Sequence, residues 1–156
     1  MQNPTKAKVL FLDDDADTRE LVSFTLEQAN IDVVLASNAA DAWKLATTDN
    51  FDLYLLDGLV PDGDGFELCR NLRRHSPSKP IVFYTGLAFK ADIQKGIEAG
   101  AKRYIVKPFY GDLAETILQT IAGEYSQHEA EKRPEPSVSP TNRIGRGFPR
   151  SASGII

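Results

Sequence analysis

The sequence predicts an α/β domain built around a doubly wound parallel sheet. Five short apolar runs alternate along the chain with five segments of helical periodicity. The runs are nearly continuous in apolar residues, which is typical of parallel strands covered by helices on both faces. Because strand–helix–strand connections are right-handed, we expect one sheet with helices packed on each side.

The predicted strands are the five apolar runs themselves. They lie at residues 8–13, 32–37, 51–57, 80–86 and 103–108. The first, third and fourth runs are the most apolar of the five. We therefore expect these three to be the central strands of the sheet, where both faces are buried.

The predicted helices fill the intervals between the strands and follow the last one. They lie at residues 18–29, 38–47, 64–75, 89–99 and 109–122. The apolar side of the first is formed by Leu21, Val22, Thr25, Leu26 and Ala29, and that of the last by Leu113, Ala114, Ile117, Leu118 and Ile121. Asn38 and Asp64 are suited to N-caps, and Gly100 is suited to end a helix.

Length and composition favour one soluble globular domain with an extension. The chain has 156 residues, of which 42% are hydrophobic and 26% are charged. Its single cysteine, Cys69, excludes a disulfide framework and is compatible with a reducing compartment. The first ten residues lack the apolar segment of a signal peptide, and no apolar run approaches the roughly 20 residues that span a bilayer. We therefore expect a cytoplasmic protein that does not bind membranes.

Charge and proline divide the chain into a body and a tail. Residues 1–125 hold 13 Lys and Arg against 19 Asp and Glu, a net charge of −6, which argues against direct nucleic-acid binding. Residues 126–156 hold 5 basic against 3 acidic residues and four of the nine prolines, with no apolar period. We expect an N-terminal arm at 1–5, a folded domain at 6–124 and a disordered tail at 125–156.

Polar residues stand where four of the five predicted strands end. Asp13 and Asp14 end the first strand, Asp57 ends the third, Thr85 closes the fourth and Lys107 closes the fifth. In doubly wound sheets, ligands bind beyond the carboxyl ends of the strands. The sequence therefore predicts that these side chains converge on one edge of the sheet.

The residue types at this edge indicate phosphoryl chemistry. Carboxylates packed together need a cation, and hard oxygen ligands favour Mg²⁺. A carboxylate is also a nucleophile toward a phosphoryl group and then forms an aspartyl phosphate. The transferred group needs its charge neutralised by metal, lysine and hydroxyl donors together. Asp15 and Asp17 have a simpler interpretation as acids at the start of the first helix, where the helix dipole favours them.

Four blocks of the sequence resemble the receiver domain of two-component response regulators. They are LFLDDDADTRELV, DLYLLDGLVPDGDGFELCRNLR, IVFYTG and AGAKRYIVKPF, and the resemblance covers residues 6 to about 124. It implies a flavodoxin-like, chemotaxis-regulator-like fold with strand order 2-1-3-4-5 and five helices. It also implies a signalling protein that is activated by phosphorylation within a two-component system or phosphorelay.

The resemblance assigns a nucleophile and a metal site. Asp57 looks like the phosphoacceptor. Asp13 and Asp14 look like the acidic pair that holds Mg²⁺ or Mn²⁺, with Asp14 binding directly and Asp13 largely through water. Asp57 and the backbone carbonyl of Leu59 would complete the ligands from the protein.

A switch is implied by the same resemblance. Thr85 looks like the hydroxyl that bonds a phosphoryl oxygen, and Lys107 looks like the lysine that pairs with it. Tyr104 matches the aromatic residue that turns inward when Thr85 moves. The bond between Lys107 and Pro108 resembles the family's cis peptide, which would aim the lysine inward.

The implied partner is a sensor histidine kinase or a histidine phosphotransfer protein that carries phosphohistidine. The protein would accept the phosphoryl group and slowly hydrolyse its own aspartyl phosphate, so it is not expected to be a turnover enzyme. Leu59 and Leu87 flank the implied site, and neither can orient an attacking water, so we expect slow self-hydrolysis. The sequence identifies neither the kinase nor the downstream protein target.

Three alternatives stay open at this point. The chain is either a single-domain regulator, which we favour, or a receiver fragment of a longer regulator whose tail serves as a linker. A haloacid-dehalogenase-type phosphohydrolase also uses an Asp nucleophile, but it needs a second Asp two residues later, where Leu59 stands. A degenerate receiver used only for binding is disfavoured by the complete set of acids, threonine and lysine.

Five further residues have mainly structural interpretations. We expect Trp43 to pack on the sheet or a neighbouring helix, and Cys69 to be a small buried hydrophobe. Phe24 falls off the apolar side of the first helix and is expected to be exposed. His75 and His128 are expected to be solvated, since no metal-ligand spacing joins them.

Overall fold

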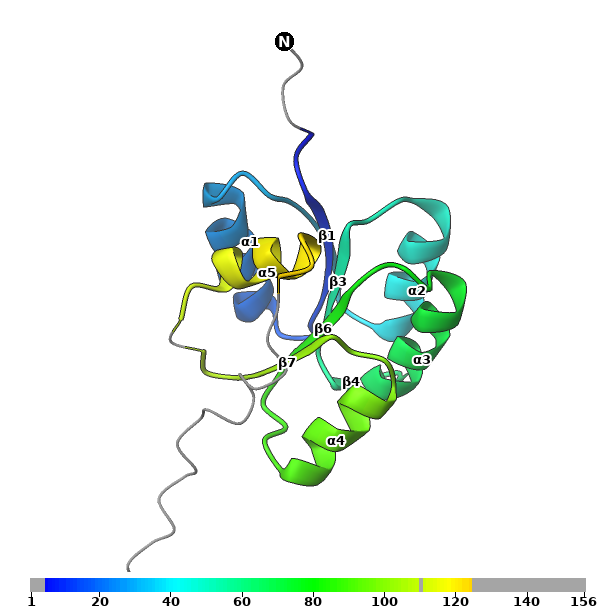
Figure 1. Ribbon diagram of the computed structural model, residues 1–156. Coiled ribbons are helices and arrows are strands. Elements are labelled where there is room, and N and C mark those ends of the chain that lie inside the picture. The colour runs from blue at the N-terminus through cyan, green and yellow to red at the C-terminus, as the bar shows by residue number, and fades with distance from the viewer. Residues whose placement is uncertain (1–4, 110, 125–156) are drawn as a thin grey trace, which may run out of the picture.

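A computed structural model describes residues 5–109 and 111–124 of the protein (Figure 1). Its main sheet has five parallel strands in the order β2-β1-β3-β6-β7, which confirms the predicted order 2-1-3-4-5 of the principal strands. The strands are β1 (Lys8–Leu12), β2 (Asp32–Ala36), β3 (Leu53–Leu56), β6 (Ile81–Thr85) and β7 (Arg103–Val106). The three most apolar runs are the central strands, as expected. The tail predicted for 125–156, including His128, lies outside the described residues.

In the described part of the chain, five helices cover the two faces of the sheet. They are α1 (Ala16–Gln28), α2 (Ala39–Thr48), α3 (Gly65–His75), α4 (Lys90–Glu98) and α5 (Leu113–Ile121). Helices α1 and α5 lie together on one face, and α2, α3 and α4 lie on the other (Figure 1). No helix among residues 5–109 and 111–124 is both long and apolar enough to cross a membrane.

Alternate residues of each central strand enter two separate cores. Toward α1 and α5, strand residues such as Phe11 and Leu55 pack with Leu26 and Ile117. Toward α2, α3 and α4, the buried cluster comprises strand and helix residues, among them Leu10, Leu56, Phe83, Ala42, Phe66 and Leu72. This double burial explains why the central strands are continuously apolar in sequence.

Helices α1 and α5 begin at residues other than those predicted. Helix α1 starts at residue 16, not 18, because the Asp15 carboxylate accepts a hydrogen bond from the Thr18 amide at 2.9 Å and caps the helix there. Helix α5 starts at residue 113, not 109, because Asp112 caps it through the Glu115 amide at 3.0 Å. In both cases an aspartate next to the apolar segment sets the boundary.

The two predicted N-caps are confirmed, whereas Gly100 lies one residue beyond the C-cap, Ala99. Asn38 caps α2 and Asp64 caps α3 through side-chain hydrogen bonds. Gly100 follows the last residue of the α4 cap and has a φ of +113°, a conformation that L side chains rarely adopt.

The apolar sides predicted for α1 and α5 include residues that do not lie in the core. Leu21 is 66% exposed and Leu118 is 41% exposed, so neither belongs to the core. The sheet and the neighbouring helix cover only a narrow stripe of each helix, and in α1 that stripe holds Val22 and Leu26. Phe24 is 61% exposed, as expected.

Trp43 packs on a neighbouring helix, as predicted. Its ring meets the His75 ring of α3 edge-on, with centroids 5.5 Å apart. His75 is exposed to solvent, as expected, and its ring also contacts Trp43. Cys69 is buried as expected, and burial raises the pKa of its thiol to about 12.

A small antiparallel hairpin between β3 and α3 was not predicted. It consists of β4 (Leu59–Val60) and β5 (Gly63–Asp64). Strands of two residues are too short to show an apolar period, so pattern analysis does not detect them. The hairpin directly follows Asp57 and therefore belongs to the surroundings of the site.

Candidate functional site

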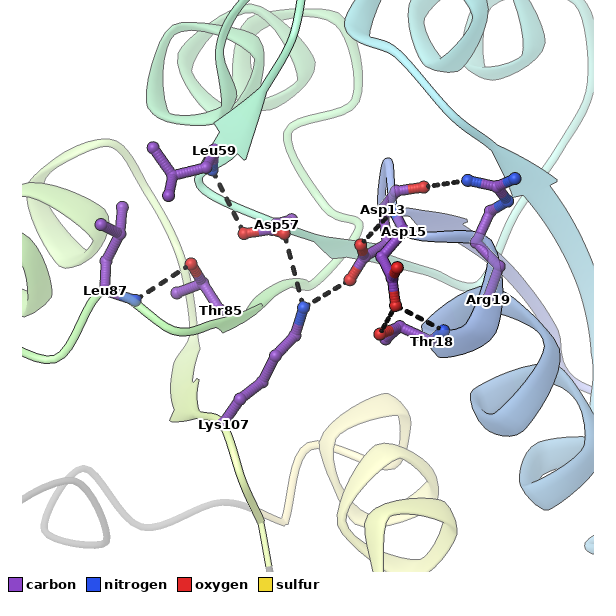
Figure 2. Close-up of polar contacts among 9 residues, drawn as sticks. All are labelled: Asp13, Asp15, Thr18, Arg19, Asp57, Leu59, Thr85, Leu87 and Lys107. Atoms are coloured by element: carbon purple, nitrogen blue, oxygen red, sulfur yellow. Dashed lines mark hydrogen bonds and ion pairs between the residues drawn. The ribbon is translucent and has the colours of Figure 1, made fainter.

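The ends of β1, β3, β6 and β7 bring the predicted site residues together at one edge of the sheet (Figure 2). Main-chain hydrogen bonds between neighbouring strands continue one residue beyond the strand ends and hold the main chain of the site in place. The Asp57 amide donates to the Leu12 carbonyl at 3.0 Å, and the Lys107 amide donates to the Thr85 carbonyl at 2.8 Å. Asp57 and Thr85 are both buried.

Lys107 bridges two acids that lie far apart in the sequence. Its Nζ donates to Asp13 Oδ2 at 2.5 Å and to Asp57 Oδ2 at 3.4 Å. Burial acts to lower the pKa of Lys107, but the hydrogen bond to Asp13 and the charges of Asp57 and Asp13 outweigh it, so the pKa is raised. The lysine is therefore held as an ammonium between the two carboxylates.

Three carboxylates form a compact oxygen-rich group. One oxygen each from Asp13, Asp14 and Asp57 lies within 4.8 Å of the others, and Asp14 is the exposed member. Three carboxylates beside the single ammonium of Lys107 leave a net charge of −2, which a divalent cation would balance. Hard oxygen donors with one solvent-facing member fit Mg²⁺, which keeps several of its waters.

The neighbouring aspartate has a different role. Asp15 accepts hydrogen bonds from the Thr18 hydroxyl at 2.5 Å and from the Thr18 amide, and these bonds hold the pKa of Asp15 below its ordinary value. Asp17 lies in the first turn of α1. The run of acids thus divides into a candidate metal pair and a helix start, as predicted.

Apolar side chains flank Asp57 on the side opposite Asp13 (Figure 2). The Leu59 amide donates to Asp57 Oδ1 at 3.2 Å, while the residue itself is 60% exposed. Leu87 lies over the main chain after Asp57, since a Cβ built on Gly58 would be 2.9 Å from Leu87 Cδ1. Neither leucine offers a polar group that could orient a water.

Tyr104 points inward and is tied to the same loop as Thr85. Its hydroxyl donates to the Leu87 carbonyl at 2.7 Å, and the Leu87 amide donates to Thr85 Oγ1 at 3.3 Å. Burial is the main cause that raises the pKa of Tyr104. The ring fits against α4 only because residue 96 is glycine, since a Cβ there would be 2.7 Å from the Tyr104 ring.

Two contacts of the site were not anticipated from the sequence. The Lys107 ammonium lies 5.2 Å from the centroid of the Tyr84 ring, so an aromatic face lies beside the cation. Asp62, in the hairpin that follows Asp57, bonds to the N-terminus of α2. No sequence period marks either residue. The Lys107–Pro108 bond is cis, as the resemblance implied.

The comparisons with known proteins agree on one family. The family model for the response regulator receiver domain matches residues 9–120. The transcriptional regulatory protein ResD of Bacillus subtilis is 38% identical over 109 residues, which cover 70% of this chain and 45% of ResD. A probable transcriptional regulator, ycf27 of Cyanidium caldarium, is 30% identical over 138 residues, 88% of this chain and 55% of that protein. The chain thus spans about half the length of these curated relatives.

Solved structures show the same similarity. A CheY-like receiver domain protein from Methanospirillum hungatei has a TM-score of 0.73 and 27% identity, with 77% of this chain and 97% of that chain covered. The beryllofluoride-activated receiver domain of DrrB has a TM-score of 0.68 and 28% identity, with 76% and 99% covered.

Proposed function

The chain belongs to the response regulator receiver family of two-component signalling, and from that membership we propose that Asp57 accepts a phosphoryl group in the presence of Mg²⁺. The observation that carries the proposal is the convergence of Asp13, Asp14 and Asp57 within 4.8 Å around the bridging ammonium of Lys107. This arrangement supports the proposal, because phosphoryl transfer needs a nucleophile, a cation and a positive side chain close together.

The proposed transfer is an in-line displacement. A carboxylate oxygen of Asp57 attacks the phosphorus of a phosphohistidine, an O–P bond forms, the P–N bond breaks, and its electron pair stays with the imidazole nitrogen. Bound Mg²⁺, held by Asp13, Asp14, Asp57 and the Leu59 carbonyl, would supply charge neutralisation for the phosphoryl oxygens. Lys107 pairs with the transferred group, and the Thr85 hydroxyl donates to one of its oxygens.

Leu87 connects the phosphoryl group to Tyr104. Its amide donates to the Thr85 hydroxyl oxygen and its carbonyl accepts from Tyr104. A movement of Thr85 toward a phosphoryl oxygen would therefore act on the loop that holds the tyrosine. We infer that this loop and the adjacent surface of α4, β7 and α5 form the switch that a partner protein reads.

The proposed phosphodonor is a histidine kinase or a histidine phosphotransfer protein, and the proposed setting is the cytoplasm. The protein would hold and slowly lose its phosphoryl group and would not turn over a substrate. A receiver within a longer regulator is supported by curated relatives that are transcriptional regulators about twice as long as the matched part. Family membership argues against the phosphohydrolase alternative.

Magnesium is expected to raise the melting temperature. A ligand that binds only the folded state at about 100 times its dissociation constant stabilises by about 2.7 kcal/mol, which corresponds to a rise of roughly 10 °C in Tm. The measurement compares melting with and without MgCl₂ at equal ionic strength. Asp14→Asn should lose most of the rise. Asp17→Asn, an exposed acid outside the carboxylate group, should keep it. An unchanged Tm in saturating Mg²⁺ would contradict the metal site.

The phosphorylated protein is expected to be long-lived. Leu59 and Leu87 offer no group to orient water, so spontaneous loss of the phosphoryl group should take many minutes. Leu59→Gln introduces an amide beside Asp57 and should shorten the lifetime of the phosphoryl group about tenfold. This effect is smaller than the rate increase that an optimised general acid or base provides. Mass spectrometry of each phosphorylated protein over time measures the lifetimes of the parent and of Leu59→Gln. Phe89→Gln, at another exposed apolar position, serves as the control. A parent lifetime of only seconds would show that the leucines do not protect the group.

A further inference from the structure

The hairpin that follows Asp57 is tied to a helix by one carboxylate. Asp62 lies between β4 and β5, and both of its oxygens accept hydrogen bonds from main-chain amides of α2. The Ala39 amide donates to Oδ1 at 2.7 Å and the Ala40 amide donates to Oδ2 at 2.9 Å. These two bonds hold the pKa of Asp62 below its ordinary value, so the group is a carboxylate at neutral pH.

This contact is not the ordinary cap of α2. Asn38 already caps the helix, since its Oδ1 accepts from the Asp41 amide at 2.8 Å. The amides of Ala39 and Ala40 lie in the first turn of α2 and have no acceptor within the helix, and Ala39 is half-buried while Ala40 is exposed. Asp62 instead comes from a segment more than twenty residues along the chain, so its bonds fix the hairpin relative to α2.

The second strand of the hairpin is fixed as well. Asp64 caps α3 by accepting from the Phe66 amide at 2.8 Å, and it pairs with Lys95 of α4 at 3.3 Å. Leu59 precedes both anchors in the chain, pairs with Asp64 across the hairpin and donates its amide to Asp57 Oδ1. The position of the Leu59 main chain relative to Asp57 thus depends on the anchored turn and on the anchored second strand of the hairpin.

We propose that Asp62 is a positioning residue for the metal site, because it clamps the hairpin to α2 and so holds the Leu59 main chain beside Asp57. The inference rests on the proposed function, in which the Leu59 carbonyl is a metal ligand. Groups that orient metal ligands without touching the ion typically contribute about 10- to 100-fold to metal affinity. The contribution of Asp62 should lie near the lower limit, since two residues separate it from Leu59.

The test is the Mg²⁺ dissociation constant, obtained from the dependence of melting temperature on MgCl₂ concentration for each full-length variant. Asp62→Ala should raise the constant about tenfold. Asp62→Asn, which keeps one acceptor oxygen, should fall between the parent and Asp62→Ala. Asn38→Ala is the matched control, because it removes a cap bond from the same helix end without touching the hairpin, and it should stay within about twofold of the parent.

The outcomes distinguish the positioning role of Asp62 from the existence of the metal site. If the parent binds Mg²⁺ and Asp62→Ala binds it equally well, the positioning role proposed for Asp62 is wrong while the proposed function stands. If Asn38→Ala weakens Mg²⁺ binding as much as Asp62→Ala does, the effect arises from a less stable α2. The positioning role proposed for Asp62 is then also wrong. A parent that binds no Mg²⁺ overturns the proposed function and the clamp together.

Discussion

Gly65→Ala is expected to destabilise the protein by about 3 kcal/mol or more, at the upper end of overpacking effects. A Cβ at residue 65 would lie 2.1 Å from the carbonyl oxygen of Asp57 and 2.9 Å from the Cα of Gly58. Both are main-chain atoms, so no side-chain rotation relieves the clash. The start of α3 and the end of β3 would have to separate, and chemical denaturation would record a large loss in the free energy of unfolding.

The same substitution should disturb the site. The Gly65 amide donates to the Gly58 carbonyl at 3.2 Å, so the close approach of these residues fixes the chain just after Asp57. Gly86→Ala is the matched control, because a Cβ there has no heavy atom within 4 Å, and it should change stability by less than about 0.5 kcal/mol. A Gly65→Ala protein as stable as the parent would show that the helix is not held so close to the strand.

Lys107→Met is expected to destabilise the metal-free protein by about 2 kcal/mol. Removing one partner of a fully buried pair costs about 3–5 kcal/mol. The Lys107 side chain is 23% exposed, so solvent reduces that figure. The loss arises because Asp13, which is 1% exposed, keeps its charge beside Asp57 without the ammonium. Saturating Mg²⁺ should narrow the difference, since a divalent cation neutralises the same oxygens.

Denaturation with and without Mg²⁺ measures this effect. Lys95→Met is the control, because Lys95 pairs with Asp64 at 3.3 Å on the surface and should contribute less than about 1 kcal/mol. If Lys107→Met matches the parent in the absence of Mg²⁺, the buried acids are not stabilised by the lysine.

The contribution of Lys107 also has a defined pH dependence. Its pKa is raised in the folded protein above the ordinary value of 10.5. A raised pKa means that the folded state binds the proton more tightly, so the stabilisation is complete below 10.5 and is lost as the pH rises through the folded pKa. The difference between the parent and Lys107→Met should therefore be constant near neutral pH and shrink only in strong alkali.

The sequence predicts the sheet and the convergence of the site for one physical reason. Parallel strands joined by right-handed crossovers place their carboxyl ends on one edge, so residues that follow different strands must meet. Asp13 and Lys107 are separated by 94 positions, yet they form a direct ion pair. Their places at strand ends were sufficient to predict that they lie together.

Other features could not be predicted because they depend on tertiary contacts without a periodic signal. Each strand of the β4–β5 hairpin has two residues, and its anchor, Asp62, looks like an ordinary turn aspartate until α2 is placed beside it. Leu21 fits the apolar period of α1, but it faces solvent because the sheet covers only part of that helix. Which residues of an amphipathic stripe are buried depends on the width of the covered surface.

The most direct test is the intact mass of the protein after incubation with a small phosphodonor such as acetyl phosphate. We expect the parent to gain one phosphoryl group when Mg²⁺ is present and none when Mg²⁺ is chelated. Asp57→Asn should gain none under either condition, while Asp17→Asn should behave as the parent does. A parent that gains no mass with Mg²⁺, or an Asp57→Asn protein that gains the same mass, would contradict the assignment of Asp57 as the phosphoacceptor.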